Sequence, residues 1–398
     1  MKISNLAILA VLAAASPVVV MAQTPPAAVA PAAAPGDAAL DAVVADYETY
    51  LKSVDPFSAS SEGDVEAMAR VPDLSRAFEL AQRAPLTNLL NRIQAIDPAS
   101  LSHGAGINHA FLLFTLSRAI EGLDYDSGAL AFDSEGGPGT WALYIGGSTR
   151  LNSVAEAEAY IQRIRAFGTL YAQTTDNARR GLSTGLIQAR SVTESAIQLA
   201  RNDVTIKPDV EPLLAPFATL PANVPQAEKA RLQVAGAAAV ASAIVPARRG
   251  WLGFLETEYL PKAPTTPGIG NRPGGKALYA YLVRQHTTTE LTPDQVHQIG
   301  LDEVARIRAR MEVEMRAAGW TGDFAGFLNF LRTDPQFYAR TPEELLWRAA
   351  WISKRVDGVI GRYMTLPRAR FTIVPVPPDI APFWTAGRGG MGTYWLNT

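Results

Sequence analysis

The chain has 398 residues, of which 48% are hydrophobic and 19% are charged, and its formal net charge is −2 at pH 7. This length allows two or three domain-sized units or one large helical body. The balanced charge, without a long basic run, argues against nucleic acid as a partner and favours a small or peptidic one. The sequence contains no cysteine, which excludes disulfides and thiol chemistry.

Residues 1–22 are typical of a signal peptide. Lys2 supplies the positive start, residues 6–20 supply the apolar stretch, and Val20-Met21-Ala22 is a small-x-small cleavage site. Ser16-Pro17 interrupts a run already short for a bilayer, so cleavage is favoured over a retained membrane anchor. Residues 23–38 predict an Ala/Pro-rich flexible linker. We therefore expect export to the periplasm or the medium, without stable membrane insertion after cleavage.

Residues 39–263 are expected to form an N-terminal helical region. Apolar residues recur at three- and four-residue steps from Leu40 onward, which is the helical period. The predicted helices cover residues 40–51, 74–96, 108–123, 154–170, 191–200 and 227–245. The last of these is alanine-rich and is expected to end at Pro246, and we expect it to be too short and too polar in places to span a membrane.

Residues 264–398 are expected to form a second, cleft-forming region, because prolines and glycines between 264 and 274 predict a dividing loop. Thr292-Pro-Asp-Gln295 predicts a capping box, and Thr341-Pro-Glu-Glu344 repeats it. Gly319 is well placed to end the first of these helices. The two predicted apolar stripes comprise Val296, Ile299, Val304, Ile307, Met311 and Met315, then Leu345, Ala349, Ile352, Val356 and Ile360.

Beyond Pro367 the pattern changes to short strands, at residues 371–374 and 393–396. The predicted fold class is therefore mainly α, a multi-helix body with a short β element of two or more strands near the C-terminus.

Two motifs point to chemistry, and their context weakens both. Gly387, Gly389 and Gly392 match the dinucleotide fingerprint G-x-G-x-x-G, but this needs a following helix that six residues cannot make. Residues 181–185 match G-x-S-x-G, but the nucleophile elbow needs a preceding buried strand, and residues 174–180 are polar and helical. A turn between helices is favoured, and a serine hydrolase acting through Ser183 remains the third alternative.

The four histidines do not predict a metal site. His103 and His109 are six residues apart, His286 and His297 are eleven apart, and none is followed by glutamate, so no H-E-x-x-H helix exists. We predict no catalytic residue and no metal ligand within the chain.

Four segments resemble the bacterial family named domain of unknown function 885. They are residues 279–289 (YAYLVRQHTTT), 290–307, 330–338 (FLRTDPQFY) and 392–398 (GTYWLNT). Weaker likenesses occur at residues 71–75, 95–101, 179–187 and 254–261. The resemblance covers nearly all of the chain after the linker.

The resemblance implies an exported, largely helical protein similar to thermolysin-like zinc metallopeptidases. In such enzymes zinc activates a water molecule for attack on a peptide carbonyl. The family's motif resembles H-E-x-x-P-G-H and normally follows the stretch that ends this chain. The resemblance therefore implies peptide hydrolysis for a complete member, and an inactive fragment, without a cofactor of its own, for this polypeptide. The alternative is a natural exported binding or scaffold protein without catalysis.

The same resemblance implies a peptide-binding role for the last residues. Gly390 and Gly392 would let a substrate backbone approach, and the strand from Thr393 to Asn397 would pair with an extended peptide. Tyr394 and Trp395 should point to opposite faces, so that one of them lines the cleft. An equally weighted interpretation is that all these residues only pack at a sheet edge.

Overall fold

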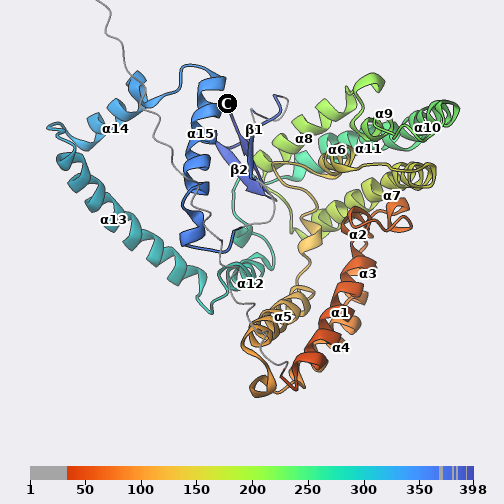
Figure 1. Ribbon diagram of the computed structural model, residues 1–398, viewed down its shortest axis with the longest axis horizontal. Helices are drawn as coiled ribbons and strands as arrows, with labels where there is room; N and C mark the ends of the chain where they lie inside the picture. Colours follow the sequence, from red (N-terminus) through yellow and green to blue (C-terminus); the bar gives the residue numbers. More distant parts are fainter. Residues whose placement is uncertain (1–33, 367–370, 379–380, 382–383, 391) are drawn as a thin grey trace, which may run out of the picture.

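The computed structural model describes residues 34–366, 371–378, 381, 384–390 and 392–398. The predicted signal peptide and residues 23–33 of the predicted linker lie outside this part. The expected fold class is confirmed, because the described chain is mainly helical with a small sheet near its C-terminus (Figure 1).

The first helices form an arm with its own core, drawn in red to orange in Figure 1. Leu40, Ile93 and Leu116 are almost completely buried within it. The predicted helix 74–96 is divided at Gln82, and the helix at 108–123 begins earlier than predicted, after the Ser102 cap. The arm comprises α1 (Asp37–Val54), α2 (Pro56–Ser61), α3 (Arg76–Ala81), α4 (Arg83–Gln94) and α5 (His103–Gly122).

The long helix α7 (Val154–Thr184) is the central element of the fold. Ser153 caps its first turn, and Gly185, with a φ of 79°, ends it in the left-handed conformation. Its buried residues pack into two apolar cores shared with neighbouring helices. These neighbours are α6 (Pro138–Ser148), α8 (Arg190–Val204), α9 (Ala215–Ala218), α10 (Gln226–Ala239) and α11 (Val245–Phe254).

Arg163 of α7 is 1% exposed and has no carboxylate partner among the described residues. Its guanidinium instead donates to the carbonyl oxygens of Arg70, Pro56 and Ala67 and to the Ser60 hydroxyl. Burial lowers its pKa to about 10. These hydrogen bonds fix the segment after α1 onto the central helix.

Pro246 does not end the alanine-rich helix, contrary to the sequence prediction. A π-helical turn, η6 (Val240–Ile244), precedes α11, and the Val245 amide donates to the Val240 carbonyl. The wider turn accommodates the proline ring, which has no N–H to donate. A second π-helical turn, η7 (Leu255–Tyr259), follows α11, so helical structure continues from Gln226 to Lys262.

This continuous helix also corrects the expectation that the segment is too short to span a membrane. Gln226–Lys262 has 37 residues and a window of mean hydropathy 1.4, so length and composition alone would allow a span. In the structure Leu232 and Trp251 of this helix pack against α7 and its neighbours, whereas Val234 is 71% exposed and only 28% of the apolar window is buried. A core helix meets the same length and composition criterion.

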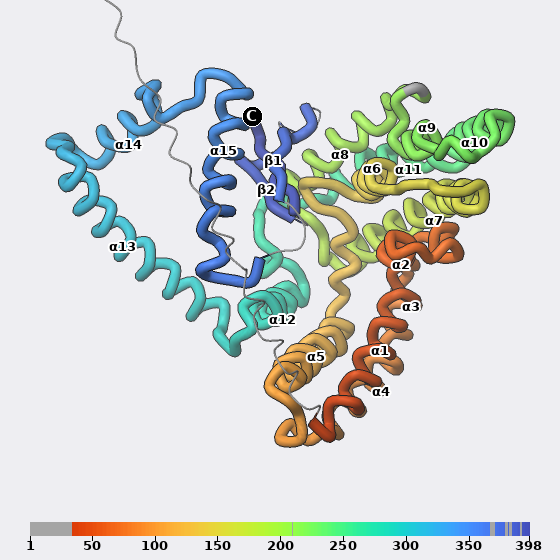
Figure 2. The backbone as a smooth tube through the Cα atoms, viewed as in Figure 1, coloured from red at the N-terminus to blue at the C-terminus, as the bar shows by residue number. Residues whose placement is uncertain are grey.

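Beyond the predicted dividing loop, α12 (Gly275–Thr287) still packs against the N-terminal arm. The Tyr281 hydroxyl donates to the Arg118 carbonyl at 2.9 Å, and Arg284 pairs with Glu121, both partners lying on α5. The chain then continues through α13 (Pro293–Ala317), α14 (Phe324–Thr333) and α15 (Pro342–Asp357), along the left side of the tube in Figure 2.

The predicted helix starts in this region are confirmed. Thr292 and Gln295 form the reciprocal capping box, and the Glu344 amide donates to the Thr341 hydroxyl. Gly319, with a φ of 82°, follows the end of α13 as expected.

The two apolar stripes on these helices are not core-facing, which corrects the sequence prediction. Val304 is 67% exposed and Ile352 is 57% exposed. Of the predicted stripe on α13 only Met315 is buried, and α15 contains no buried residue. The remaining exposed large apolar residues of these helices are Ile299, Leu301, Ile307, Met311, Val313, Trp347, Trp351 and Val356. Helices α13 and α15 therefore have apolar stripes, of the kind normally buried in a core, that no described residue covers.

The sheet has the order β1-β3-β2, with β1 (Thr372–Pro375), β2 (Gly387–Gly390) and β3 (Thr393–Leu396). β3 pairs in parallel with β1, where Ile373 lies opposite Tyr394, and antiparallel with β2, where Arg388 lies opposite Trp395. The strands predicted at 371–374 and 393–396 are confirmed. β2 was not predicted, because a run of glycines has low strand propensity.

Candidate functional site

A groove runs across the middle of α7 and is made of two adjoining hollows of about 400 and 450 Å³. Both hollows are lined by Trp141 of α6 and Thr174 of α7, which makes them parts of one surface. The first hollow continues along the loop before α6, and the second continues toward α1 and α3. The other shared lining residues are Leu74, Leu130 and Ala131.

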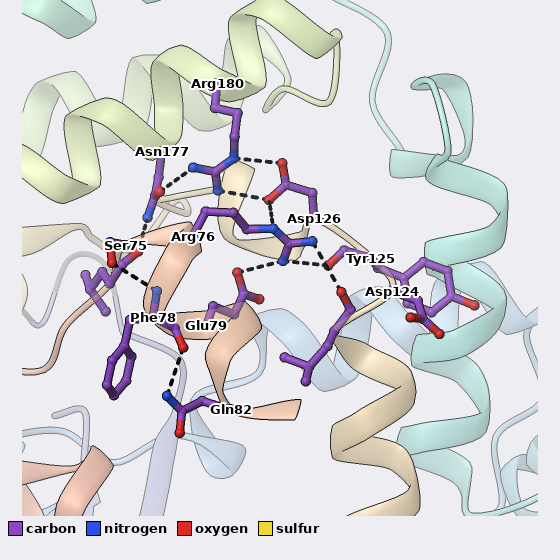
Figure 3. A network of polar contacts seen from close by, with 12 residues as sticks. Ser75, Arg76, Phe78, Glu79, Gln82, Asp124, Tyr125, Asp126, Asn177 and Arg180 are labelled. Carbon is purple, nitrogen blue, oxygen red and sulfur yellow. Dashed lines mark hydrogen bonds and ion pairs between the residues drawn. The ribbon is translucent and has the colours of Figure 1, made fainter. Parts of the chain in front are cut away.

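A polar network holds the wall beside the second hollow (Figure 3). Arg180 of α7 forms a two-point ion pair with Asp126, at 2.8 and 2.9 Å. Arg76 of α3 donates to Glu79 and to the carbonyl oxygens of Leu123 and Tyr125. The hydrogen bond from Arg180 holds the pKa of Asp126 below its usual value. Three segments distant in sequence are thereby fixed around the groove.

The sheet contacts the other end of the groove through one ion pair. Arg388 of β2 donates to both carboxylate oxygens of Glu135, at 2.7 and 3.1 Å, and Glu135 lines the first hollow. These hydrogen bonds lower the pKa of Glu135. The guanidinium also lies 4.7 Å from the centre of the Trp384 ring. The glycine-rich strand is therefore next to the groove.

The expected pairing of Thr393–Asn397 with a peptide is not compatible with the sheet. β3 is the central strand, and both of its edges are already occupied, by β1 and by β2. The side-chain amide of Asn397 is also occupied, because it donates to the carbonyl oxygens of Ala381 and Trp384. The edge beside the groove, which pairs with no strand among the described residues, belongs to β2, which includes Gly390; Gly392 lies in the turn that follows, with a φ of 79°.

Tyr394 and Trp395 do point to opposite faces, as predicted. A Cβ placed on Gly387 would overlap the Tyr394 hydroxyl, so the tyrosine ring lies across the glycines of β2. Trp395 is 37% exposed and lies opposite Arg388 in the register, on the other face. Tyr394 is thus the packing residue of the two.

Ser183 does not lie in a nucleophile elbow. It is in the last turn of α7, with helix rather than strand before it, and its hydroxyl donates to the Arg180 carbonyl at 2.7 Å. His286 lies near the end of α12 and His297 near the start of α13, and both are exposed. The local structure does not provide the strand-to-helix turn that exposes a catalytic serine.

A zinc ion does not fit the described part of the chain. No group of three or more His, Cys, Asp or Glu side chains among the described residues is arranged to hold a metal ion. His109 is buried and its Nε2 lies 2.9 Å from the Ile93 carbonyl oxygen, so this ring has a structural partner.

A second polar cluster is buried in the helical body. Arg248 of α11 forms a two-point ion pair with Glu211, at 2.6 and 3.0 Å, and both side chains are at most 5% exposed. Burial raises the pKa of nearby Asp203 to about 6, against the opposing effect of Arg248. The ion pair joins α11 to the short helices before α10 and is a structural element.

Sequence reasoning missed the groove. Trp141 and Thr174 carry no motif, and their meeting depends on tertiary packing. The charged residues of the lining were also not identified.

A family match covers residues 56–396 and has the description "Bacterial protein of unknown function (DUF885)". The chain belongs to the DUF885 family. This confirms the resemblance found at residues 279–289, 290–307, 330–338 and 392–398 as far as the family is concerned. No curated protein matches the sequence.

Two solved structures share the fold of this DUF885 protein. One is from Colwellia psychrerythraea and is described as a "putative lipoprotein", with a TM-score of 0.79, 21% identity, and coverage of 91% of this chain and 67% of that chain. The other, from Shewanella oneidensis, is described as a "putative lipoprotein of unknown function", with a TM-score of 0.58, 14% identity, and coverage of 92% and 65%. The chain spans about two thirds of the length of these structures.

Proposed function

We propose that this protein is an exported, peptide-binding body that supplies the cleft, but not the catalytic group, of a metallopeptidase-like hydrolase. The observation that carries the proposal is the apolar surface on α13 and α15, which no described residue covers. Apolar helix surfaces of this kind are normally buried against another element or a partner. Additional polypeptide packed there would complete the structure and is where a catalytic group would come from.

The lengths of the solved structures support this view. Each has about a third of its chain outside the match with this protein. The descriptions of both as lipoproteins support an exported protein of the cell envelope. The predicted signal peptide leads to the same localisation.

The edge of β2 supports the peptide-binding part of the proposal. An extended peptide binds an open sheet edge through main-chain hydrogen bonds, and glycines allow its backbone to come close. The Arg388–Glu135 ion pair connects this edge to the groove on α7. A peptide on β2 would therefore run toward a hollow that accepts its side chains.

Zinc chemistry belongs to the proposal only through the family resemblance. The described residues contain no suitable ligand set, so this chain contributes binding and orientation rather than a hydrolytic step. A non-catalytic binding or scaffold protein is the second candidate, and the same lack of a ligand set among the described residues favours it.

Two experiments test the proposal. The purified 398-residue protein is incubated with a defined peptide mixture, with and without zinc, and the products are identified by mass spectrometry. We expect peptide binding without cleavage, and zinc-dependent cleavage by this chain would overturn the proposal. Sequencing the gene beyond the codon for Thr398 separates the two candidates, since an in-frame H-E-x-x-P-G-H segment supports the hydrolase and its absence supports the scaffold.

A further inference from the structure

We infer that the groove on α7 selects peptides through arginine side chains, which bind between Trp141 and the carboxylates of Asp73 and Asp133. The inference deepens the proposed function by naming the class of peptide, and it rests on that function.

The charge of the groove is the first argument. Among the described residues its lining contains no lysine, arginine or histidine but four acidic residues, Asp73, Glu79, Asp133 and Glu135. Arg76 pairs with Glu79 and Arg388 pairs with Glu135, which neutralises two of them. Asp73 and Asp133 form no ion pair with any described residue. The groove therefore presents uncompensated negative charge to a ligand.

The two unpaired carboxylates are also held in place. Oδ1 of Asp73 accepts hydrogen bonds from the Ser75 amide and from Nε2 of Gln173, each at 2.8 Å. Oδ1 of Asp133 accepts from the Glu135 amide at 2.8 Å. In both residues Oδ2 accepts no hydrogen bond within the described part of the chain. Each carboxylate is oriented by neutral donors, and its second oxygen is available to a cation.

Trp141 supplies a ring that lines both hollows. It is 39% exposed, and its ring packs edge-on against Phe57 with centroids 6.0 Å apart. A cation over a tryptophan face is stabilised by the ring quadrupole, and the planar guanidinium of arginine stacks there better than an ammonium group. Asp73 lines one hollow and Asp133 the other, so each of the two hollows that share Trp141 has one of these carboxylates in its lining. The combination favours arginine over lysine.

The test uses three otherwise identical peptides that carry two arginines, two lysines or two glutamates. Their affinities for the 398-residue protein are measured by calorimetry at low and high salt. We expect the arginine peptide to bind most tightly and its affinity to fall with salt. Asp73→Asn and Asp133→Asn keep the Oδ1 acceptor but remove the charge, and each should weaken the arginine peptide about fivefold.

Two matched controls separate the groove from general surface effects. Glu194→Gln, at an exposed acid of α8 without an ion pair to any described residue, should leave the affinity unchanged. Trp141→Leu should remove the preference for arginine over lysine, whereas Trp347→Leu, at an exposed tryptophan on α15, should not.

The outcomes distinguish this inference from the proposed function. Equal affinity for all three peptides would overturn the inference and leave peptide binding intact. Binding of none of them would overturn both. Loss of arginine binding in Glu194→Gln as large as in Asp133→Asn would also contradict a site in the groove.

Discussion

Arg388 and Glu135 form a two-point ion pair across 253 positions of sequence. The pair joins the glycine-rich strand β2 to the loop before α6, at the end of the groove on α7. Both side chains are substantially exposed, at 42% and 58%. An exposed pair of this kind positions two segments more than it stabilises the fold.

We therefore expect Arg388→Ala to leave the midpoint of urea unfolding nearly unchanged but to increase hydrogen exchange in β2. Hydrogen exchange measured by mass spectrometry, peptide by peptide, distinguishes the two effects, because local opening has its own free energy. Arg306→Ala on α13, which breaks another exposed ion pair, is the control and should not affect β2. A large loss of global stability in Arg388→Ala would contradict a positioning role.

The buried pair of Arg248 and Glu211 should behave differently. Arg248→Ala leaves the Glu211 carboxylate buried without its cation, and breaking such a pair costs about 3–5 kcal/mol in free energy of unfolding. Urea denaturation measures this loss. Arg231→Ala, at an exposed arginine paired with Glu158 and Glu228, is the matched control and should cost far less. Equal effects in the two variants would refute the argument from burial.

The raised pKa of Asp203 predicts a pH-dependent gain of stability on mutation. Its pKa is about 6 in the folded protein against a reference value of 3.8, so folding favours the protonated form. The cost of holding the carboxylate ionised is absent below about pH 4, develops between pH 4 and 6, and is complete above pH 6. Asp203→Asn should therefore raise the free energy of unfolding by roughly 3 kcal/mol at pH 7 and change it little at pH 4. Unfolding curves at both pH values decide this, and equal effects at both would exclude the titration of Asp203 as the cause.

Two glycines of α7 give opposite predictions for the same substitution. A Cβ on Gly181 would lie 2.7 Å from the carbonyl oxygens of Ala129 and Leu186, so Gly181→Ala should destabilise the protein by about 1–3 kcal/mol. A Cβ on Gly168 would lie 3.8 Å from the Ala243 carbonyl oxygen, an ordinary contact. Gly168→Ala should stabilise by about 0.5–1 kcal/mol through helix propensity. Thermal unfolding of both variants tests the contrast, which a loss of stability in Gly168→Ala would contradict.

Local signals made much of the fold predictable from the sequence. Thr292 and Thr341 specify helix starts because their hydroxyls reach amides only three residues away. The apolar stripe of α1 is similarly local, and its core position is confirmed by Leu40 and Val43. Helix caps and helical stripes of this kind are determined by residues within a few positions of each other, and not by tertiary contacts.

The incorrect predictions concern features that depend on contacts between residues distant in sequence. The stripe on α13 has the helical period, but a period does not show whether a partner is present, and Val304 is exposed. The strand at Thr393–Leu396 was correct, yet its interpretation as an open edge failed because the more distant β1 pairs with one of its edges and β2 with the other. The groove depends on Asp73, Asp133 and Trp141 being brought together by α7, which no sequence spacing records.

The π-helical turn before Pro246 determines which faces of the helical segment Gln226–Lys262 point toward the cores before and after it. Residues before its end, such as Leu232 and Ile244, belong to one core, and Trp251 and Leu255 after it belong to another. Deleting a single residue inside the π-helical turn, such as Ser242, would leave an α-helical turn there and bring the Pro246 ring against the carbonyl oxygen one turn before it, while the composition stays almost unchanged. In this helix the number of residues is as strictly determined as their identity.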